Sequence, residues 1–344
     1  MNTIKFEVCV KCFTYNQSKY ITDALDGFCC QETSFPYVCC IIDDASIDGE
    51  QQVIRQYINE NFCPTDNEEF YEKETDYAYI IYSRHKTNTN CYFAVLLLKQ
   101  NLYSRDGKLL KLQYISEWTR YAVYEALCEG DDWWVSPQKL QSQYDYMESH
   151  PRCGLCHTKA KTFYQKKGIY GKRILGQNVP NFESLLFHNR IVTLTAFIRV
   201  EALKGYDEYV NGQRWLMGDR PQWLYVARKW DIYMLPEIMG VYRILTDSAM
   251  NRKSYESRKK FLESGNEMIS FFAQKETPHI VSDIKNNCYS ILCMNAFVYK
   301  KYKEFIVLYS NIRHPSFKLQ IRYIYVKLML LRKYFVYFYH KNTL

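Results

Sequence analysis

Three carboxylates near the middle of the chain have the types and spacing of a metal-binding cluster. Glu129, Asp131 and Asp132 directly follow an apolar run that ends at Cys128. Hard divalent cations prefer carboxylate oxygens, and a cation with open positions can also hold the two phosphates of a nucleotide. The cluster therefore predicts a divalent-metal site. The alternative interpretation is a solvated acidic turn before a helix.

A second pair of carboxylates, Asp43 and Asp44, ends another apolar run that begins at Tyr37. A carboxylate at such a strand end can accept hydrogen bonds from a nucleobase or from ribose hydroxyls. Alone, the pair would equally suit a helix-capping loop. Two acidic strand ends favour the binding interpretation, because ligands of open α/β sheets lie beyond the carboxyl ends of the strands.

The turn FTYNQ, which follows the first apolar run, supplies a third group. Its backbone is expected to face the same edge of the sheet, and Tyr15 can stack on a base. The turn contains neither GxGxxG nor GxxxxGK(S/T). Nicotinamide-cofactor enzymes and P-loop enzymes are therefore disfavoured.

The periodicity of apolar residues predicts the elements that position these groups. The first half is expected to contain strands at 4–12, 37–42, 77–83 and 120–128, and helices at 18–30, 50–61, 92–103, 109–118 and 137–149. An opening of strand, helix, strand and helix implies the α/β class, with a mostly parallel sheet covered by helices.

The second half changes character near residue 250. Strands are expected at 153–164 and 191–200, and the polar turn in WLMGDRPQWLYVARK runs into a helix. Beyond it the pattern is helical only, over 255–275, 279–301 and 317–340. We therefore expect a catalytic domain at 1–250 and a helical, basic and aromatic extension at 251–344.

The 13 cysteines bear on the compartment. The segment MNTIKFEVCVKCF lacks the pattern of an export signal, and several cysteines lie in strand-like runs, so we expect buried reduced thiols and a cytoplasmic protein. Cys153, Cys156 and His157 have the spacing of a haem c attachment site. That chemistry needs an exported chain, so we interpret them as core residues.

The formal charge of +8 is concentrated at the end of the chain. No acidic residue follows Glu304, whereas 317–344 contains Lys318, Arg322, Lys327, Arg332, Lys333 and Lys341. A basic helix with an aromatic face suits an anionic membrane surface at the inner face of the cell membrane. The alternative is a helix packed on the catalytic domain. Nucleic acid is disfavoured, because no recognition fold accompanies the charge.

Four segments, in order, resemble glycosyltransferase family 2 of the GT-A fold. VKCFTYNQSKYITDALDGFCCQ is similar to the family's strand, turn and first helix, and YVCCIIDDASIDG to its nucleotide segment. ALCEGDDWWVSPQKLQSQYDYM is similar to the acidic metal motif, with Glu-Gly-Asp in place of the usual DxD. MGDRPQWLYVARKWDIYMLPEIMGVYR is similar to the region of the catalytic base. The resemblance covers about residues 4 to 250.

The resemblance implies a role for each matched residue. Asp219 would be the general base, which removes the proton of the acceptor hydroxyl. Arg243 would contact a phosphate, although the His of the family's YRxH is replaced by Leu245. The nucleotide sugar would be bound by Thr14, Tyr15, Asn16, Asp43, Asp44 and Asp131, and Mn²⁺ or Mg²⁺ by Glu129, Asp131 and Asp132. Without the resemblance, Asp219 would be interpreted as a helix cap.

We therefore expect an inverting, metal-dependent glycosyltransferase, since one base with no covalent intermediate implies inversion. It would move a sugar from a UDP- or GDP-sugar to a hydroxyl of a glycan or lipid-linked oligosaccharide. A nucleotide- or carbohydrate-binding protein without turnover is the alternative. A third possibility is a membrane or nucleic-acid adaptor built on the basic tail.

Overall fold

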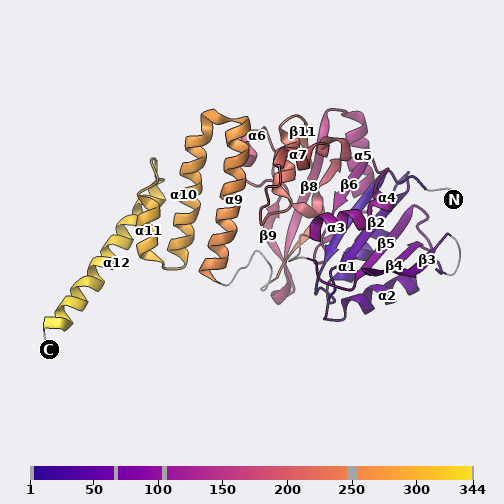
Figure 1. Ribbon diagram of the computed structural model, residues 1–344, viewed down its shortest axis with the longest axis horizontal. Coiled ribbons are helices and arrows are strands. Elements are labelled where there is room, and N and C mark those ends of the chain that lie inside the picture. Colours follow the sequence, from indigo (N-terminus) through magenta and orange to yellow (C-terminus); the bar gives the residue numbers. More distant parts are fainter. Residues whose placement is uncertain (1–3, 66–68, 103–106, 246–253, 343–344) are drawn as a thin grey trace. The chain divides into compact units, whose positions relative to one another are not determined.

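The chain forms two compact units. The computed structural model describes residues 4–65, 69–102, 107–245 and 254–342 (Figure 1). The first unit comprises 1–180, 189–206 and 225–245, and the second comprises 181–188, 207–224 and 246–344.

A parallel core of four strands lies at the centre of the first unit. Its strands are β1 (Val8–Thr14), β2 (Tyr37–Asp43), β5 (Cys91–Leu98) and β6 (Tyr124–Leu127), in the order β5, β2, β1, β6. Every residue of β2 and β5 is buried. Strands buried on both faces are typical of parallel sheets between layers of helices, because both faces of such a sheet are covered.

Further strands, most of them in antiparallel pairs, widen this core on both sides. On the β5 side lie β4 (Ala78–Arg84) and β3 (Tyr71–Glu74). On the β6 side the sheet continues through β10 (Phe197–Arg199), β8 (Cys153–Tyr164), β11 (Asp231–Ile244) and β7 (Trp133–Trp134), and β9 (Ile169–Leu175) pairs with β8. The α/β class is confirmed, and the described sheet is mixed. Its four central strands are parallel, and β8 and β11 form a second parallel pair.

Helices cover both faces of the sheet. On one face, apolar residues of α1 (Ile21–Cys29), α2 (Glu50–Asn61) and α5 (Lys139–Ser149) share a core with alternate residues of the central strands. The other face is covered by the segment that contains α3 (Gly107–Tyr114) and α4 (Ser116–Thr119). Ile115 and Trp118 of this segment belong to a core that also contains residues of β2 and β5. The two cores hold the strand ends in fixed register.

The predicted helix at 92–103 is wrong, because most of this segment is strand β5. CYFAVLLL is apolar on every side and buried throughout, so it has neither a strand period nor a helix period. Pairing with β2 and β4 decides the outcome. Strand β11, which carries Arg243, was also not expected from the sequence.

The second unit is helical in the residues that the structure describes. Its long helices are α9 (Tyr255–Glu276), α10 (Val281–Val298) and α12 (Phe317–Asn342), close to the predicted ranges, with α11 (Tyr302–Tyr309) as an addition. The short α6 (Phe182–Phe187) also belongs to it. Helices α7 (Tyr206–Val210) and α8 (Arg220–Ala227) lie where the chain passes between the two units. None of the described helices combines the length and apolarity needed to cross a bilayer.

Candidate active site

The predicted strand ends meet at one edge of the sheet. Thr14 lies opposite Asp43 in the register of β1 and β2, and the Asp44 amide donates to the Thr14 carbonyl at 3.0 Å. On the other side of β1, the Gly130 amide donates to the Phe13 carbonyl at 3.3 Å. The turns that follow β1, β2 and β6 are therefore neighbours, as the acidic strand ends predicted.

The turns after β1 and β2 are braced against each other by Asn16. Its amide donates to the Ser46 hydroxyl at 2.8 Å, and its side-chain oxygen accepts from the Ile47 amide at 2.9 Å. Asn16 and Ala45 have φ values of 54° and 59°. Asn tolerates this left-handed conformation better than most residues. Tyr15, beside it, is 45% exposed and is accessible for stacking.

Glu50, at the start of α2, joins the same two turns and was not identified from the sequence. Its buried carboxylate accepts hydrogen bonds from the Thr14 hydroxyl, from the Ser46 hydroxyl at 2.9 Å and from the Gln17 amide at 2.8 Å. Burial raises the pKa of Glu50, and these hydrogen bonds oppose that rise. Its position in the first turn of a helix was the one available signal, because acidic residues are favoured there.

Asp43 presents a buried carboxylate oxygen for which the described residues supply no hydrogen-bond partner. Its side chain is fully buried, and Oδ1 accepts from Gln51 Nε2 at 2.6 Å and from the Ser46 amide at 3.1 Å. Oδ2 accepts no hydrogen bond from the described part of the chain. A buried polar atom without a partner is costly, so an N–H or O–H donor of a ligand would be stabilised there.

Asp44 is already engaged by the chain. Its Oδ2 forms a buried ion pair with Lys111 Nζ at 2.7 Å, and its Oδ1 accepts from the Leu102 amide at 2.8 Å. The Asn101 side chain donates to its carbonyl at 3.0 Å. Asp44 therefore fixes the loop after β5 and the helix α3 to the end of β2.

The acidic turn after β6 concentrates negative charge. Asp132 is buried, and burial together with the charges of Asp131 and Glu129 raises its pKa well above the ordinary value. Burial also raises the pKa of Asp131, against the opposing effects of its own amide and of Arg243. Glu129 is exposed. The Asp131 and Asp132 carboxylates therefore resist ionisation unless a cation offsets their negative charge.

Gly130 allows this turn to approach β1 closely. A Cβ at Gly130 would lie 2.3 Å from the Thr14 hydroxyl oxygen, 2.6 Å from Gln17 Oε1 and 2.7 Å from Thr14 Cβ. Such distances leave no room for any side chain. Glycine is thus required where the β6 turn crosses the end of β1.

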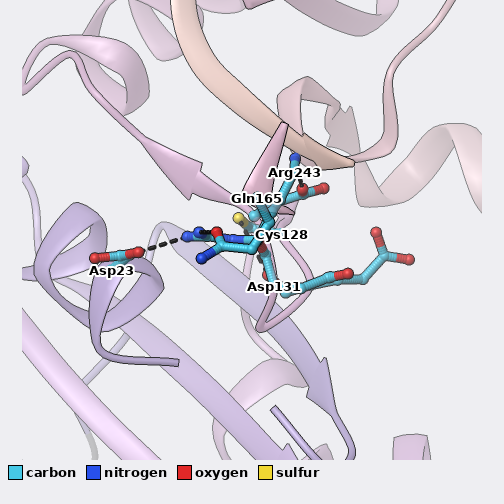
Figure 2. Close-up of polar contacts among 7 residues, drawn as sticks. Asp23, Cys128, Asp131, Gln165 and Arg243 are labelled. Carbon is cyan, nitrogen blue, oxygen red and sulfur yellow. Dashed lines mark hydrogen bonds and ion pairs between the residues drawn. The ribbon is translucent and has the colours of Figure 1, made fainter. Parts of the chain in front are cut away.

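Arg243, near the end of β11, fastens the acidic turn. Its amide donates to Asp132 Oδ1 and its Nε to the Asp131 carbonyl, both at 2.7 Å. Figure 2 shows its guanidinium reaching Asp23 on α1 and the Gln165 side chain. The buried guanidinium also lies 4.4 Å from the centre of the Trp133 ring and 4.8 Å from that of Tyr20. Sequence reasoning identified Arg243 but not this aromatic enclosure.

The donor set of the acidic turn is compatible with a hard cation, although the turn is not a closed cage. Within the residues that the structure describes, no three His, Cys, Asp or Glu side chains converge to hold an ion on their own. Asp131 and Glu129 could still supply one or two oxygens, with further ligands from phosphate oxygens, as is common for Mg²⁺ at nucleotide sites. The repulsion that raises the pKa of Asp132 would be relieved by such a cation.

Asp219 lies in the second unit, immediately before α8. Its Oδ1 accepts from the Arg220 amide at 2.7 Å, and its carbonyl accepts from the Gln222 amide at 2.9 Å. The Arg220 side chain is buried and donates to the carbonyls of Leu185 and Leu186 on α6. The start of α8 is therefore anchored within its own unit. These contacts suit a helix-terminal residue and are also compatible with a base.

The haem-like spacing lies inside strand β8. Cys153, Cys156 and His157 are buried, and burial lowers the pKa of His157 to about 4. An imidazole of this kind is neutral. The interpretation as core residues is consistent with these observations.

A surface pocket of 610 Å³ lies away from the acidic edge. Thr33 and Asn88, which precede β2 and β5, contribute to its lining. It therefore lies near the amino ends of these strands. The polar side chains there bond one another, as in the 2.6 Å contact of Gln138 with Glu32. The strand-end chemistry described above does not extend to this pocket.

Comparison with curated proteins finds relatives of unestablished function. No protein-family model matches the chain. Uncharacterised proteins of Mycobacterium tuberculosis (strain H37Rv) and Mycobacterium bovis are each 28% identical to it over 256 residues, which is 73% of this chain and 62% of theirs. The matched region thus spans about three fifths of the length of these relatives.

Comparison with solved structures is more informative about the fold. Residues 1–349 of S. aureus TarS in complex with UDP-GlcNAc align with a TM-score of 0.54 and 16% identity, covering 93% of this chain and 79% of that one. The mannosyltransferase PcManGT from Pyrobaculum calidifontis, in complex with GDP-Man and Mn²⁺, aligns with a TM-score of 0.52 and 14% identity, covering 96% and 81%. The expected architecture is confirmed, and the chain has a glycosyltransferase fold of the GT-A type.

Proposed function

We propose that this chain is an inverting glycosyltransferase of family 2 type, which transfers a sugar from a UDP- or GDP-sugar to a hydroxyl group. The observation that carries the proposal is the buried Asp43 carboxylate, whose Oδ2 has no partner among the described residues. It lies at the sheet edge that also carries the acidic turn. Solved structures of the same fold bind UDP-GlcNAc and GDP-Man, which supports a nucleotide sugar as the ligand class.

The nucleoside would be held by the turns after β1 and β2. Tyr15 is exposed and could stack on the base, and Asp43 would accept an N–H or O–H of the nucleoside. Thr14 and Asn16 would contribute through the bracing of the two turns, in which Glu50 takes part. Asp44 would act at the same edge, chiefly through the loop that it anchors.

A divalent cation, Mn²⁺ or Mg²⁺, would be held by Asp131, with Glu129 and Asp132 in support. When bound, it would neutralise charge on the departing nucleoside diphosphate. Arg243 would hold the turn in place through its contacts with Asp131 and Asp132, and would add positive charge near the phosphates. The Mn²⁺ of PcManGT supports this choice of cation.

Asp219 would serve as the base. It would remove the proton of the acceptor hydroxyl as the oxygen attacks the anomeric carbon, and the nucleoside diphosphate would leave from the opposite face. The anomeric configuration is thereby inverted in one displacement. The acceptor would be a glycan or a lipid-linked oligosaccharide in polysaccharide biosynthesis, at the cytoplasmic side of the cell membrane.

Calorimetry with UDP and GDP, with and without Mn²⁺, tests the donor site. Binding should require the cation and should be largely lost in Asp131→Ala, because the cation that would offset the phosphate charge would lose a carboxylate ligand. Binding of full strength without metal would contradict the proposed site.

Turnover separates an enzyme from the alternative, a nucleotide- or carbohydrate-binding protein without activity. Slow hydrolysis of a nucleotide sugar in the presence of Mn²⁺, abolished in Asp131→Ala, is expected of the enzyme. Tight, metal-dependent binding with no hydrolysis and no transfer to any acceptor would favour the alternative.

A further inference from the structure

Over the residues whose side chains the structure describes, helix α12 packs on its own unit with one face. Leu319 and Val326 are buried in a core shared with residues of α10 and α11, such as Cys293 and Phe305. Tyr323 and Leu330 line the same core. This face of α12 is therefore covered by helices of its own unit.

A second apolar face of α12 is exposed. Phe317, Ile321, Ile324, Leu328 and Leu331 are 74%, 52%, 59%, 61% and 53% exposed. Their spacing of four, three, four and three residues places them along one stripe of the helix. A contiguous exposed apolar stripe of this kind marks an interaction surface, whereas isolated apolar residues do not.

The charges that flank this stripe are all positive. Lys318 follows Phe317, Lys327 precedes Leu328, and Arg332 follows Leu331, and all three are exposed. The sequence contains no acidic residue after Glu304. Lys333 and Lys341, named above, lie beyond the side chains that the structure describes.

The charge pattern selects among occupants of the stripe. The spacing would suit a coiled coil with a second copy of the chain. In a coiled coil, however, the flanking positions face the partner helix, so lysine and arginine side chains would lie opposite one another and repel. A nucleic acid would satisfy the charges but would leave the apolar stripe in water. An anionic lipid bilayer satisfies both, since its boundary accepts apolar side chains and its headgroups attract lysine and arginine.

We infer that α12 is a membrane-docking helix that lies on an anionic bilayer, with Ile321, Ile324 and Leu328 in the acyl boundary and Lys318, Lys327 and Arg332 at the headgroups. This inference is independent of the proposed glycosyl transfer, because it rests only on the exposed face of α12. If the proposed glycosyl transfer also holds, the bilayer is the surface at which the chain would meet a lipid-linked acceptor.

Sedimentation of the full chain with vesicles tests this inference. Vesicles of phosphatidylcholine with about one third phosphatidylglycerol should bind the chain, and Ile321→Ser/Leu328→Ser should weaken binding by about tenfold or more through lost apolar burial. The matched control is Ile169→Ser/Ile174→Ser on β9, where the side chains are 52% and 41% exposed. The control should bind normally, and the melting temperatures of both variants should stay close to that of the parent.

Removing charge gives a second, independent arm. Lys318→Gln/Lys327→Gln/Arg332→Gln should weaken vesicle binding by about 100-fold in total. Each lysine or arginine near an anionic membrane surface raises the affinity by a factor of about five. Added salt should weaken binding of the parent and leave little further effect on this variant. Equal binding to vesicles of phosphatidylcholine alone would contradict the inference.

The other occupants predict different results. If a second copy covers the stripe, sedimentation velocity without lipid should show a dimer that Ile321→Ser/Leu328→Ser dissociates. If nucleic acid binds there, the Gln variant should lose binding to RNA while the Ser variant retains it, with no binding to vesicles. Either result would overturn the membrane assignment. A monomer without lipid, with vesicle binding that both sets of substitutions reduce, would support it.

Discussion

Asp43 and Asp44 are adjacent carboxylates with different surroundings, and this difference predicts different effects of substitution. In Asp43→Asn, the carbonyl oxygen would keep the Gln51 and Ser46 contacts, so the amide group would occupy the Oδ2 position. A ligand donor would then meet another donor. We expect UDP or GDP affinity to fall by at least about tenfold, the cost of one lost hydrogen bond to a charged group. Calorimetry with Mn²⁺ present measures this.

Asp44→Asn is the matched control. It removes the charge opposite Lys111 in a buried pair, which typically costs about 3–5 kcal/mol because the remaining charge is left uncompensated. The melting temperature should fall clearly for Asp44→Asn and little for Asp43→Asn. A large loss of nucleotide affinity in Asp44→Asn without loss of stability would instead mean that Asp44 contacts the nucleoside directly.

Lys139 predicts a pH dependence of stability. It is fully buried, its Nζ donates to Gln143 Oε1 at 2.7 Å and lies 4.0 Å from the centre of the Trp134 ring, and burial lowers its pKa to about 7. Between pH 7 and 10.5 the unfolded chain therefore binds more protons at this lysine than the folded chain. The free energy of unfolding should rise with pH in that window, by at most about 1.4 kcal/mol per unit.

The test compares urea unfolding of the parent and of Lys139→Met at pH 7 and pH 8. Both values lie below the ordinary pKa of a cysteine thiol. The parent should gain about 1 kcal/mol relative to the variant over this interval. The variant removes only this titration, so other groups cancel in the difference. Parallel pH profiles would show that Lys139 does not titrate in this range.

The sequence predicted which residues lie at the strand ends but not how they are paired. Asp43 and Asp131 follow apolar runs, so the register of the parallel strands brings their turns together. The contacts of Asp44 with Lys111 and of Arg243 with Asp23 join residues far apart in the chain. Local periodicity contains no information about such pairs. Glu50 was overlooked for the same reason, because its role depends on two turns that meet only in the fold.

At the scale of elements, the predicted bounds were correct where the sequence marked both ends of the helix. Helix α2 was predicted over its exact range, since the turn ASIDG precedes it and the following segment is polar. Strand β5 was mistaken for a helix because a fully buried segment shows no periodicity. That error hid the loop after β5, which binds Asp44 through Asn101 and Leu102.

The turn after β6 approaches the end of β1 closely at Gly130, and this approach predicts the effect of Gly130→Ala. The added methyl group would meet Thr14 and Gln17, so either β1 or the acidic turn must shift. We expect a loss of about 1–3 kcal/mol, the usual cost of overpacking, together with weaker Mn²⁺-dependent nucleotide binding as Asp131 is displaced. Thermal unfolding and calorimetry on the same protein measure the two effects.

Gly168→Ala provides the control for Gly130→Ala. Gly168 has a φ of 65° but open space around its Cβ position, so alanine there should cost about 1 kcal/mol through backbone strain alone. Nucleotide affinity should be unchanged in this variant. If Gly130→Ala also binds nucleotide normally, the close approach of the turn to β1 is not needed for the site.

At the scale of the whole molecule, the residues with proposed roles are divided between two units. The nucleotide and metal residues belong to the first unit, and Asp219 belongs to the second. The sequence could not indicate this division, because 207–224 lies between segments of the sheet. Helix α8 begins with Arg220 in the second unit and ends with Ala227 in the first, so the chain itself connects the two. Donor binding and transfer should therefore be separable by substitution.

Asp219→Asn tests this separation. If Asp219 is the base, donor and metal affinity should stay near those of the parent, because Glu129, Asp131 and Asp43 are unchanged. Transfer to a competent acceptor should fall by about 10²- to 10⁴-fold, the usual range for loss of a general base. The helix-cap alternative predicts near-normal transfer, since Asn caps a helix about as well as Asp. Measured together, donor affinity by calorimetry and transfer rate distinguish the two, and an active Asp219→Asn would remove Asp219 from the mechanism while leaving the donor site intact.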